Sequence, residues 1–243
     1  MAQRQARTGD FGLEGVRVAL DRRVHVEFCQ LSVESDPETI GVDRDDAFAG
    51  QQAGLCGPAV PGALWLATGL HTGYVGFRVE VHDEEPPLDP GWDEAVEVPF
   101  HPRSPSTVLA EAGGVTYWEL GLPETGYRVR YCARGMDEGH DRDTLLEGEP
   151  SVDHYLLQFW PAPPAPGRVV RQSTGRQAAY WHAYVRGLPP PLTPEERAEA
   201  ERLAPEVHAR AVQQARLARA AGPEGPDLSA AALRAVIHVR PAP

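Results

Sequence analysis

The residues best suited to chemistry in this chain are three cysteines and nine histidines. None of them stands in a catalytic pattern, because the sequence has no G-x-S-x-G elbow, no glycine-rich phosphate loop, no H-E-x-x-H pair and no paired C-x-x-C. Cys56 lies in the small-residue stretch AGLCGPAVPG, where a thiol becomes a nucleophile only if a histidine approaches it. We therefore predict no catalytic residue and no cofactor.

Two patterns could hold a metal ion, but neither has the right spacing. His25 and Cys29 are four residues apart, and on a strand that rises ~3.3 Å per residue they are too distant to share an ion. The stretch MDEGHDRD, from Met136 to Asp143, lacks the glycine and glutamate positions of a calcium-binding loop. We predict no metal site and interpret this stretch as a solvated hairpin loop.

Negative charge is the most informative chemical feature. The chain has 35 acidic and 23 basic residues, and a net charge of −12. Residues 80–97 include eight acids without a lysine or arginine, and residues 137–153 include seven acids with one arginine, so the two segments together are more negative than the whole chain. If they meet at one end of the fold, they attract a basic protein, while nucleic acid and anionic membranes are repelled.

The residues expected to contact such a partner are Asp83, Glu84, Glu85, Asp137, Glu138, Asp141 and Asp143. The alternative is that these acidic segments only keep the protein soluble.

Strands of alternating apolar and polar residues must position these segments. The alternation is clearest over 74–82, where valine and phenylalanine take every second position. Within 24–33 the parity of the apolar residues changes, which predicts a bulge near Cys29 or Gln30. Seven or more short strands, without helical spacing between them, predict a mainly β fold, an antiparallel β-sandwich with an appended C-terminal helical segment. The other candidate strands cover 16–20, 63–68, 95–100, 115–120, 127–133, 154–160 and 179–185.

The pattern changes after the three prolines at 189–191. Thr193 suits a helix N-cap, Pro194 suits the first helical position, and glutamates follow where the helix dipole favours anions. This predicts a helix over 193–221, which Pro205 kinks or divides. The stretch 228–239 fits either a short helix or a strand.

These patterns divide the chain into a flexible N-terminus at 1–12, a β-sandwich domain at 13–187, and a Pro-rich joint with a C-terminal helical extension at 188–243. No stretch approaches the ~20 apolar residues of a membrane-spanning helix, and the first ten residues lack the apolar core of a signal peptide. With an odd number of cysteines, we expect a reduced, cytoplasmic protein. Arginine without any lysine or asparagine is typical of a high-GC bacterium.

Several segments, read in order, resemble the competence protein J family. The likeness covers about residues 16–161, and its clearest pieces are VPFH at 98–101 and LPETGYRVRYCA at 122–133; the others are VEFCQLSVES, GYVGFRVEVH and DHYLLQFWP. The best-known members inhibit a DNA-entry nuclease. The resemblance implies an inhibitor whose anionic surface competes with DNA phosphates, and it transfers no individual contact residue.

The leading hypothesis is a non-enzymatic protein-binding module, an inhibitor or immunity-type protein that acts on a nuclease, a toxin or another basic effector. One alternative is a structural or regulatory subunit of a larger bacterial assembly that docks through the helix at 193–221. A second alternative is an enzyme that uses Cys56 or a histidine–acid site on its loops.

Overall fold

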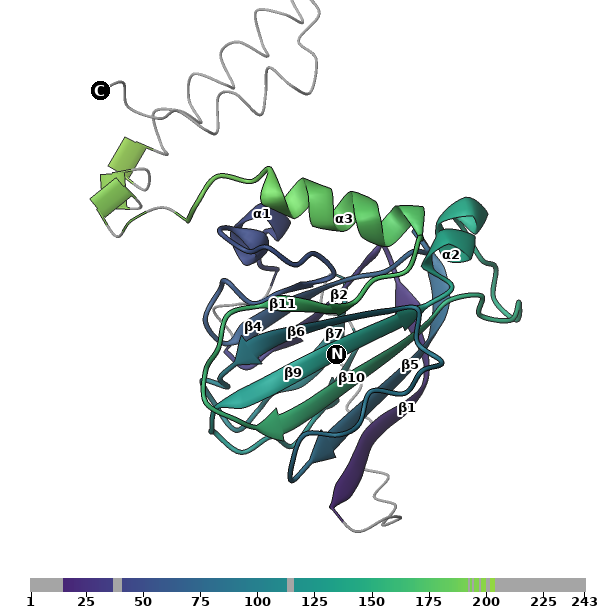
Figure 1. Cartoon of the computed structure of the whole chain (residues 1–243), viewed down its shortest axis with the longest axis horizontal. Helices are drawn as coiled ribbons and strands as arrows, with labels where there is room; N and C mark the ends of the chain where they lie inside the picture. The colour runs from purple at the N-terminus through teal and green to yellow at the C-terminus, as the bar shows by residue number, and fades with distance from the viewer. Residues whose placement is uncertain are drawn as a thin grey trace, which may run out of the picture. The chain divides into compact units, whose positions relative to one another are not determined.

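The computed structural model describes residues 15–36, 41–112 and 116–191, together with seven positions between 193 and 203. The chain divides into two compact units, Met1–Pro191 and Leu192–Pro243. In the described part of the first unit, eleven strands form two sheets. The predicted mainly β fold is therefore confirmed (Figure 1).

The larger sheet has six strands, and every neighbouring pair in it is antiparallel except one. Strand β10 lies parallel to β5, with His154 opposite Gly76, and antiparallel to β9 on its other side. A parallel pair needs a long connection, and more than seventy residues separate these two strands in the sequence. In spatial order the strands are β1 (Val16–Val26), β5 (Gly73–His82), β10 (His154–Pro161), β9 (Tyr127–Arg134), β6 (Glu94–Phe100) and β11 (Arg168–Arg171).

The smaller sheet is antiparallel throughout, and one face of each sheet contributes to a shared core. Every second residue of β5, from Val75 to Val79, is buried in that core with Tyr131 and Leu66 from the other strands. The five strands, in spatial order, are β3 (Cys56–Gly57), β4 (Ala63–Ala67), β2 (Gln30–Glu34), β7 (Val108–Glu111) and β8 (Tyr117–Glu119).

The parity change within 24–33 is a tight turn rather than the predicted bulge. Glu27 and Gln30 pair across it, and the two residues between them, Phe28 and Cys29, have φ angles of 57° and 58°. The chain reverses here and passes from β1 in one sheet to β2 in the other. Across a two-residue turn, Val24 and Val26 before it and Leu31 and Val33 after it all face the core. Their numbers change from even to odd, which in the sequence looks the same as a change of register within one strand.

Helix α3 (Arg176–Arg186) replaces the strand that was predicted over 179–185. Its buried residues include Ala178, Trp181 and Val185, a helical spacing. Trp181 packs on Trp65 of β4 and on Phe48 of the short helix α1 (Arg44–Phe48). The run of aromatic residues suggested a strand, but these residues cover the core from a helix (Figure 1).

Helix α2 (Met136–Arg142) replaces the loop that was predicted for MDEGHDRD.

In the second unit, the described positions from 195 to 203 are helical. Thr193 and Glu196 form reciprocal hydrogen bonds of 2.8 and 3.2 Å, as in a capping box. The N-terminal segment at 1–12, most of the helix at 193–221 and the stretch 228–239 lie outside the described residues. None of the helices in the described part of the chain is long and apolar enough to cross a membrane.

Candidate functional site

The two groups of predicted contact residues lie at opposite ends of the six-stranded sheet. Residues 83–85 follow His82, the last residue of β5, whereas α2 follows Arg134, the last residue of β9. Arg134 pairs with His154, and His154 pairs with Gly76 near the start of β5. Six strand positions separate Gly76 from His82, which is about 20 Å. Residues 83–85 and residues 137–143 therefore do not form one surface, although the first acidic segment reaches the α2 end at Asp93, whose Oδ2 accepts the Gly135 N–H at 3.1 Å.

The loop that carries residues 83–85 crosses the outer face of the six-stranded sheet towards β6. Leu88 and Trp92 pack there against a small cluster that contains Cys132. Arg130 donates to the Pro86 carbonyl at 2.7 Å and pairs with Glu85 at 3.0 Å. Glu85 is thus partly neutralised, while Asp83 and Glu84 remain exposed.

Several acids of the first segment stabilise the sheet instead of facing a partner. Glu97 is 1 % exposed and accepts hydrogen bonds from Arg128, Arg130 and Arg168 at 2.8–3.3 Å. Burial by itself would raise the pKa of Glu97, but the arginine hydrogen bonds and charges outweigh it and lower that pKa. The arginines come from alternate positions of β9 and from β11, a signal that is visible in the YRVRY motif.

The second segment also contains a buried acid, Asp153. Its Oδ2 accepts hydrogen bonds from the Leu70 backbone at 3.0 Å and from the Tyr155 hydroxyl at 2.6 Å, and burial raises its pKa. Gly139 of α2 packs directly on this carboxylate, since a Cβ there would lie 2.6 Å from it. Asp153 therefore holds α2 and the loop at 68–72 together, and it contributes nothing to surface charge.

Of the four predicted contact residues at α2, Asp137 has a structural role. Its carboxylate accepts the backbone N–H groups of Arg176 and Gln177 at 2.9 and 2.8 Å, so it caps helix α3, whose own N-cap is a glycine. Burial raises the pKa of Asp137, but these two hydrogen bonds, together with the Arg176 and His140 charges, outweigh burial and lower that pKa. Asp141 pairs with Arg176 at 2.8 Å on the surface.

The other two, Glu138 and Asp143, are exposed. Asp143 ends α2 with a φ of 60°, and its carboxylate accepts a hydrogen bond from the Thr144 hydroxyl at 2.9 Å. Helix α2 thus presents Glu138, Asp141 and Asp143 to solvent at one end of the sandwich (Figure 1).

Two large apolar side chains are exposed at the same end, although the apolar parity of residues 24–28 predicted that one of them, Phe28, would face the core. Phe28 is 66 % exposed and Leu146 is 70 % exposed. Phe28 follows β1, whose last residue, Val26, pairs with Gly73 at the start of β5. We define the α2-end surface as the turn at 27–29, the loop at 68–72 and residues 137–149. Only the structure shows that these two share one end.

The thiols are not suited to nucleophilic chemistry. Cys56 lies fully buried in β3, not on an open loop, and burial raises its pKa. Burial also raises the pKa of Cys132 to about 12 and that of Cys29 to about 11. All three therefore stay protonated near neutral pH, where a thiol is a poor nucleophile.

The described residues contain one close histidine–acid pair on β5, where His82 Nε2 lies 3.0 Å from Glu80 Oε2. The same carboxylate also accepts hydrogen bonds from Gln158 at 2.9 Å and from Arg78 at 2.7 Å, so it belongs to a polar network of the sheet. His182 is buried, and its Nδ1 accepts the Gly54 N–H at 2.8 Å. Burial, with a smaller contribution from Arg186, lowers the pKa of His182 to about 4. Within residues 15–36, 41–112 and 116–191 there is also no group of three or more potential metal ligands.

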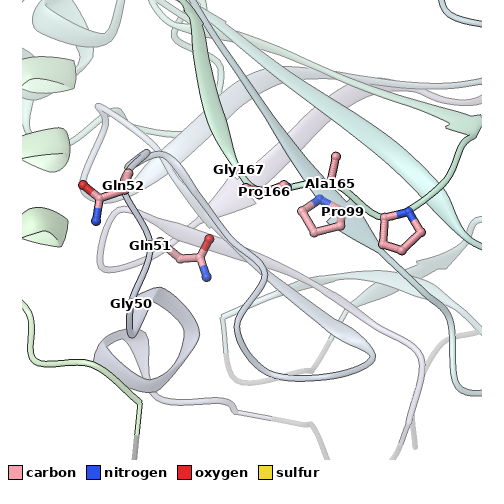
Figure 2. Close-up of a pocket in the computed structure, with 8 residues that line it drawn as sticks. Gly50, Gln51, Gln52, Pro99, Ala165, Pro166 and Gly167 are labelled. Atoms are coloured by element: carbon pink, nitrogen blue, oxygen red, sulfur yellow. The ribbon is translucent and has the colours of Figure 1, made fainter.

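One hollow on the first unit has a volume of about 400 Å³. Figure 2 shows Gln51 and Gln52 on one side of it, and Pro99 and Ala165 on the other. Its lining consists only of glycine, alanine, proline and glutamine residues. It holds no charged, thiol or hydroxyl side chain for catalysis.

No protein-family model matches the chain, and no curated protein sequence matches it. A similar solved structure is ComJ from Bacillus subtilis, described as an inhibitor of the DNA-degrading activity of NucA, with 15% identity and a TM-score of 0.44 over 60% of this chain and 98% of that one. Another is the crocagin biosynthetic gene J product, with 15% identity and a TM-score of 0.39 over 61% of this chain and 99% of that one.

Proposed function

We propose that this chain is a non-enzymatic protein-binding module that inhibits a basic partner, with a nuclease as the class it fits best. The observation that carries the proposal is the group of exposed carboxylates on α2 and the turn after it, Glu138, Asp141 and Asp143. Such a group accelerates the approach of a positively charged protein and competes with phosphate for the same basic groove.

The α2-end surface is held in a fixed arrangement, which favours tight binding because little order must be gained on association. Asp153 and Gly139 fix α2 to the sandwich from below, and Asp137 fixes it to α3. Residues 83–85 remain a separate acidic group at the other end, where Glu85 is already paired with Arg130. Each end thus has an acid in an ion pair, since Asp141 pairs with Arg176. We assign partner binding to the α2 end because it also exposes Phe28 and Leu146.

The state of the thiols supports a binding role over an enzymatic one. The cysteine that could serve as a nucleophile, Cys56, is buried, and burial raises its pKa. Inhibition by occlusion of a partner's groove needs only a complementary surface.

The test compares two variants with the same change in charge. Glu138→Lys with Asp141→Lys alters the α2 end, and Asp83→Lys with Glu84→Lys alters the opposite end. Each tagged variant and the wild type are used to capture proteins from a lysate of the source cells. Each protein that salt releases is then assayed for degradation of DNA with and without the tagged chain.

We expect the wild type and the 83/84 variant to capture and inhibit a basic nuclease, and the 138/141 variant to lose at least about tenfold in affinity. Equal capture by both variants would exclude the α2 end as the binding surface. Capture of proteins whose activity is unchanged by the chain would exclude inhibition.

A further inference from the structure

We infer that Phe28 and Leu146 are the apolar anchors of the α2-end surface, and that its partner offers an apolar patch surrounded by arginine or lysine. This inference rests on the proposed function and names the chemistry that the partner must have.

The position of Phe28, in a strained turn and exposed to solvent, favours contact with another molecule. The two-residue turn between Glu27 and Gln30 requires positive φ at both central positions, for which asparagine and glycine are the favoured residues. Among the described residues, the one aromatic contact of the Phe28 ring is with the His71 ring, in an edge-to-face arrangement with the centroids 5.6 Å apart. A phenylalanine that is 66 % exposed here leaves apolar area in water that an interface would bury.

Leu146 is exposed although the next residue towards α2, Leu145, is buried in the core. The Leu145 N–H donates to the Thr72 carbonyl at 2.9 Å, and the Leu146 N–H donates to the Glu149 carboxylate at 2.7 Å. Its backbone is therefore tied down on both sides. A backbone held in this way loses little freedom on binding, which lowers the cost of using Leu146 as an interface anchor.

The two anchors are joined through the loop at 68–72. His71 contacts the Phe28 ring, and its backbone N–H donates to the Asp143 carbonyl at 3.0 Å. The Cys29 N–H donates to the His71 carbonyl at 3.2 Å, so the turn and the segment after α2 share the same support. Phe28 and Leu146 thus belong to one continuous surface, not to two unrelated loops.

The charges around the anchors decide which partner fits. Glu27, Glu138, Asp143 and Glu147 are all exposed there. Of the basic residues, Arg142 is paired with Glu149, and Arg23 donates to the Glu149 carbonyl, so the acids outnumber the arginines. A second copy of this chain would bring the same negative charges face to face, and like charges disfavour that contact. A basic protein instead gains both from the buried apolar anchors and from the acidic rim.

The test uses two synthetic probes with the same number of positive charges, a helical peptide of leucine and lysine and a peptide of lysine and glycine. Fluorescence anisotropy measures the binding of each peptide to the full-length chain and to Phe28→Ser and Leu146→Ser. Tyr180→Ser is the matched control, because Tyr180 is a large apolar side chain that is 55 % exposed on α3. Thermal melting verifies that each variant is folded.

We expect the leucine-containing peptide to bind wild type at least about tenfold more tightly than the leucine-free peptide. Phe28→Ser and Leu146→Ser should remove most of that advantage, and Tyr180→Ser should leave it unchanged. Equal binding of the two peptides, or equal effects of all three substitutions, would overturn the inference.

The two proposals fail in distinguishable ways. If Phe28→Ser retains full inhibition of the captured nuclease while Glu138→Lys with Asp141→Lys does not, the anchors are wrong and the proposed function stands. If no nuclease is inhibited but the leucine-containing peptide still depends on Phe28, the anchors stand without the inhibitory role.

Discussion

The carboxylate of Asp137 accepts the backbone N–H of Gln177 at 2.8 Å, so α2 supplies the N-terminal cap of α3 across 40 residues of sequence. This bond links the acidic end of the molecule to the helix that covers the core through Trp181. A residue that appeared to be a partner contact is therefore part of the framework.

Replacement of that cap is expected to destabilise the fold. Asp137→Ala should lower the free energy of unfolding by about 1 kcal/mol, because two amide groups at the start of α3 lose their acceptor. Urea denaturation measures the loss. The neighbouring exposed residue supplies the control, since Glu138→Ala should change stability by no more than about 0.5 kcal/mol. Similar losses in both variants would argue against the cap.

Acid should destabilise the protein through His182. Its pKa is about 4 in the fold and ~6.5 in the unfolded chain, so the stability it contributes is complete above pH 6.5 and falls as the pH drops towards 4. The loss amounts to about 3 kcal/mol at the lower end of that window. It is measured as the urea midpoint against pH.

His182→Asn is the matched variant, because its amide oxygen can still accept the Gly54 N–H but does not titrate. The slope of stability between pH 6.5 and 4 should be smaller in this variant than in wild type. An identical slope would assign the acid sensitivity to other groups.

Loss of the Glu97 carboxylate should be among the most damaging single changes. Glu97→Ala leaves the buried guanidinium groups of Arg128 and Arg130 without their shared acceptor, which costs about 3–5 kcal/mol. The control is Glu84→Ala, which removes an exposed acid from the loop between β5 and β6. Thermal melting of the two variants compares a buried carboxylate with an exposed one. A comparable melting temperature for both variants would contradict the network.

The turn at Phe28 should be more stable with the residue that its backbone favours. Phe28→Asn is expected to raise the free energy of unfolding by about 0.5 kcal/mol, since asparagine tolerates positive φ better than an aromatic residue does. The same substitution should weaken partner binding. Guanidinium denaturation and anisotropy on one sample measure both effects, and a loss of stability would show that Phe28 supports the fold.

The strands were largely predictable because their evidence is local. In β5 the alternation of valine with polar residues indicates a half-buried strand without knowledge of its neighbours. Helix α3 was not predicted, although Ala178, Trp181 and Val185 follow helical spacing, because a short aromatic run also fits a strand. The parallel pairing of β10 with β5 was beyond reach, since it depends on contacts distant in sequence.

The candidate site was only partly predictable for the same reason. The sequence shows which segments are rich in acidic residues, but only the fold shows which of these carboxylates are buried in hydrogen-bond networks and which face solvent. Glu97 and Asp153 belong to the two acidic segments and are both buried. Their roles depend on Arg130 and on the Leu70 backbone, which lie 33 and 83 residues away in the sequence. Exposed carboxylates such as Glu138 were correctly placed on the surface.

The central position of β10 has a consequence for synthesis of the chain on the ribosome. β10 lies between β5 and β9, so before residues 154–161 emerge the sheet exists as two separate parts, each with an unpaired edge. The β5 edge waits for its partner during the translation of about seventy residues, and the β9 edge during about twenty. Such unpaired edges promote association between nascent chains. The last long strand to be made is the one that joins the two halves.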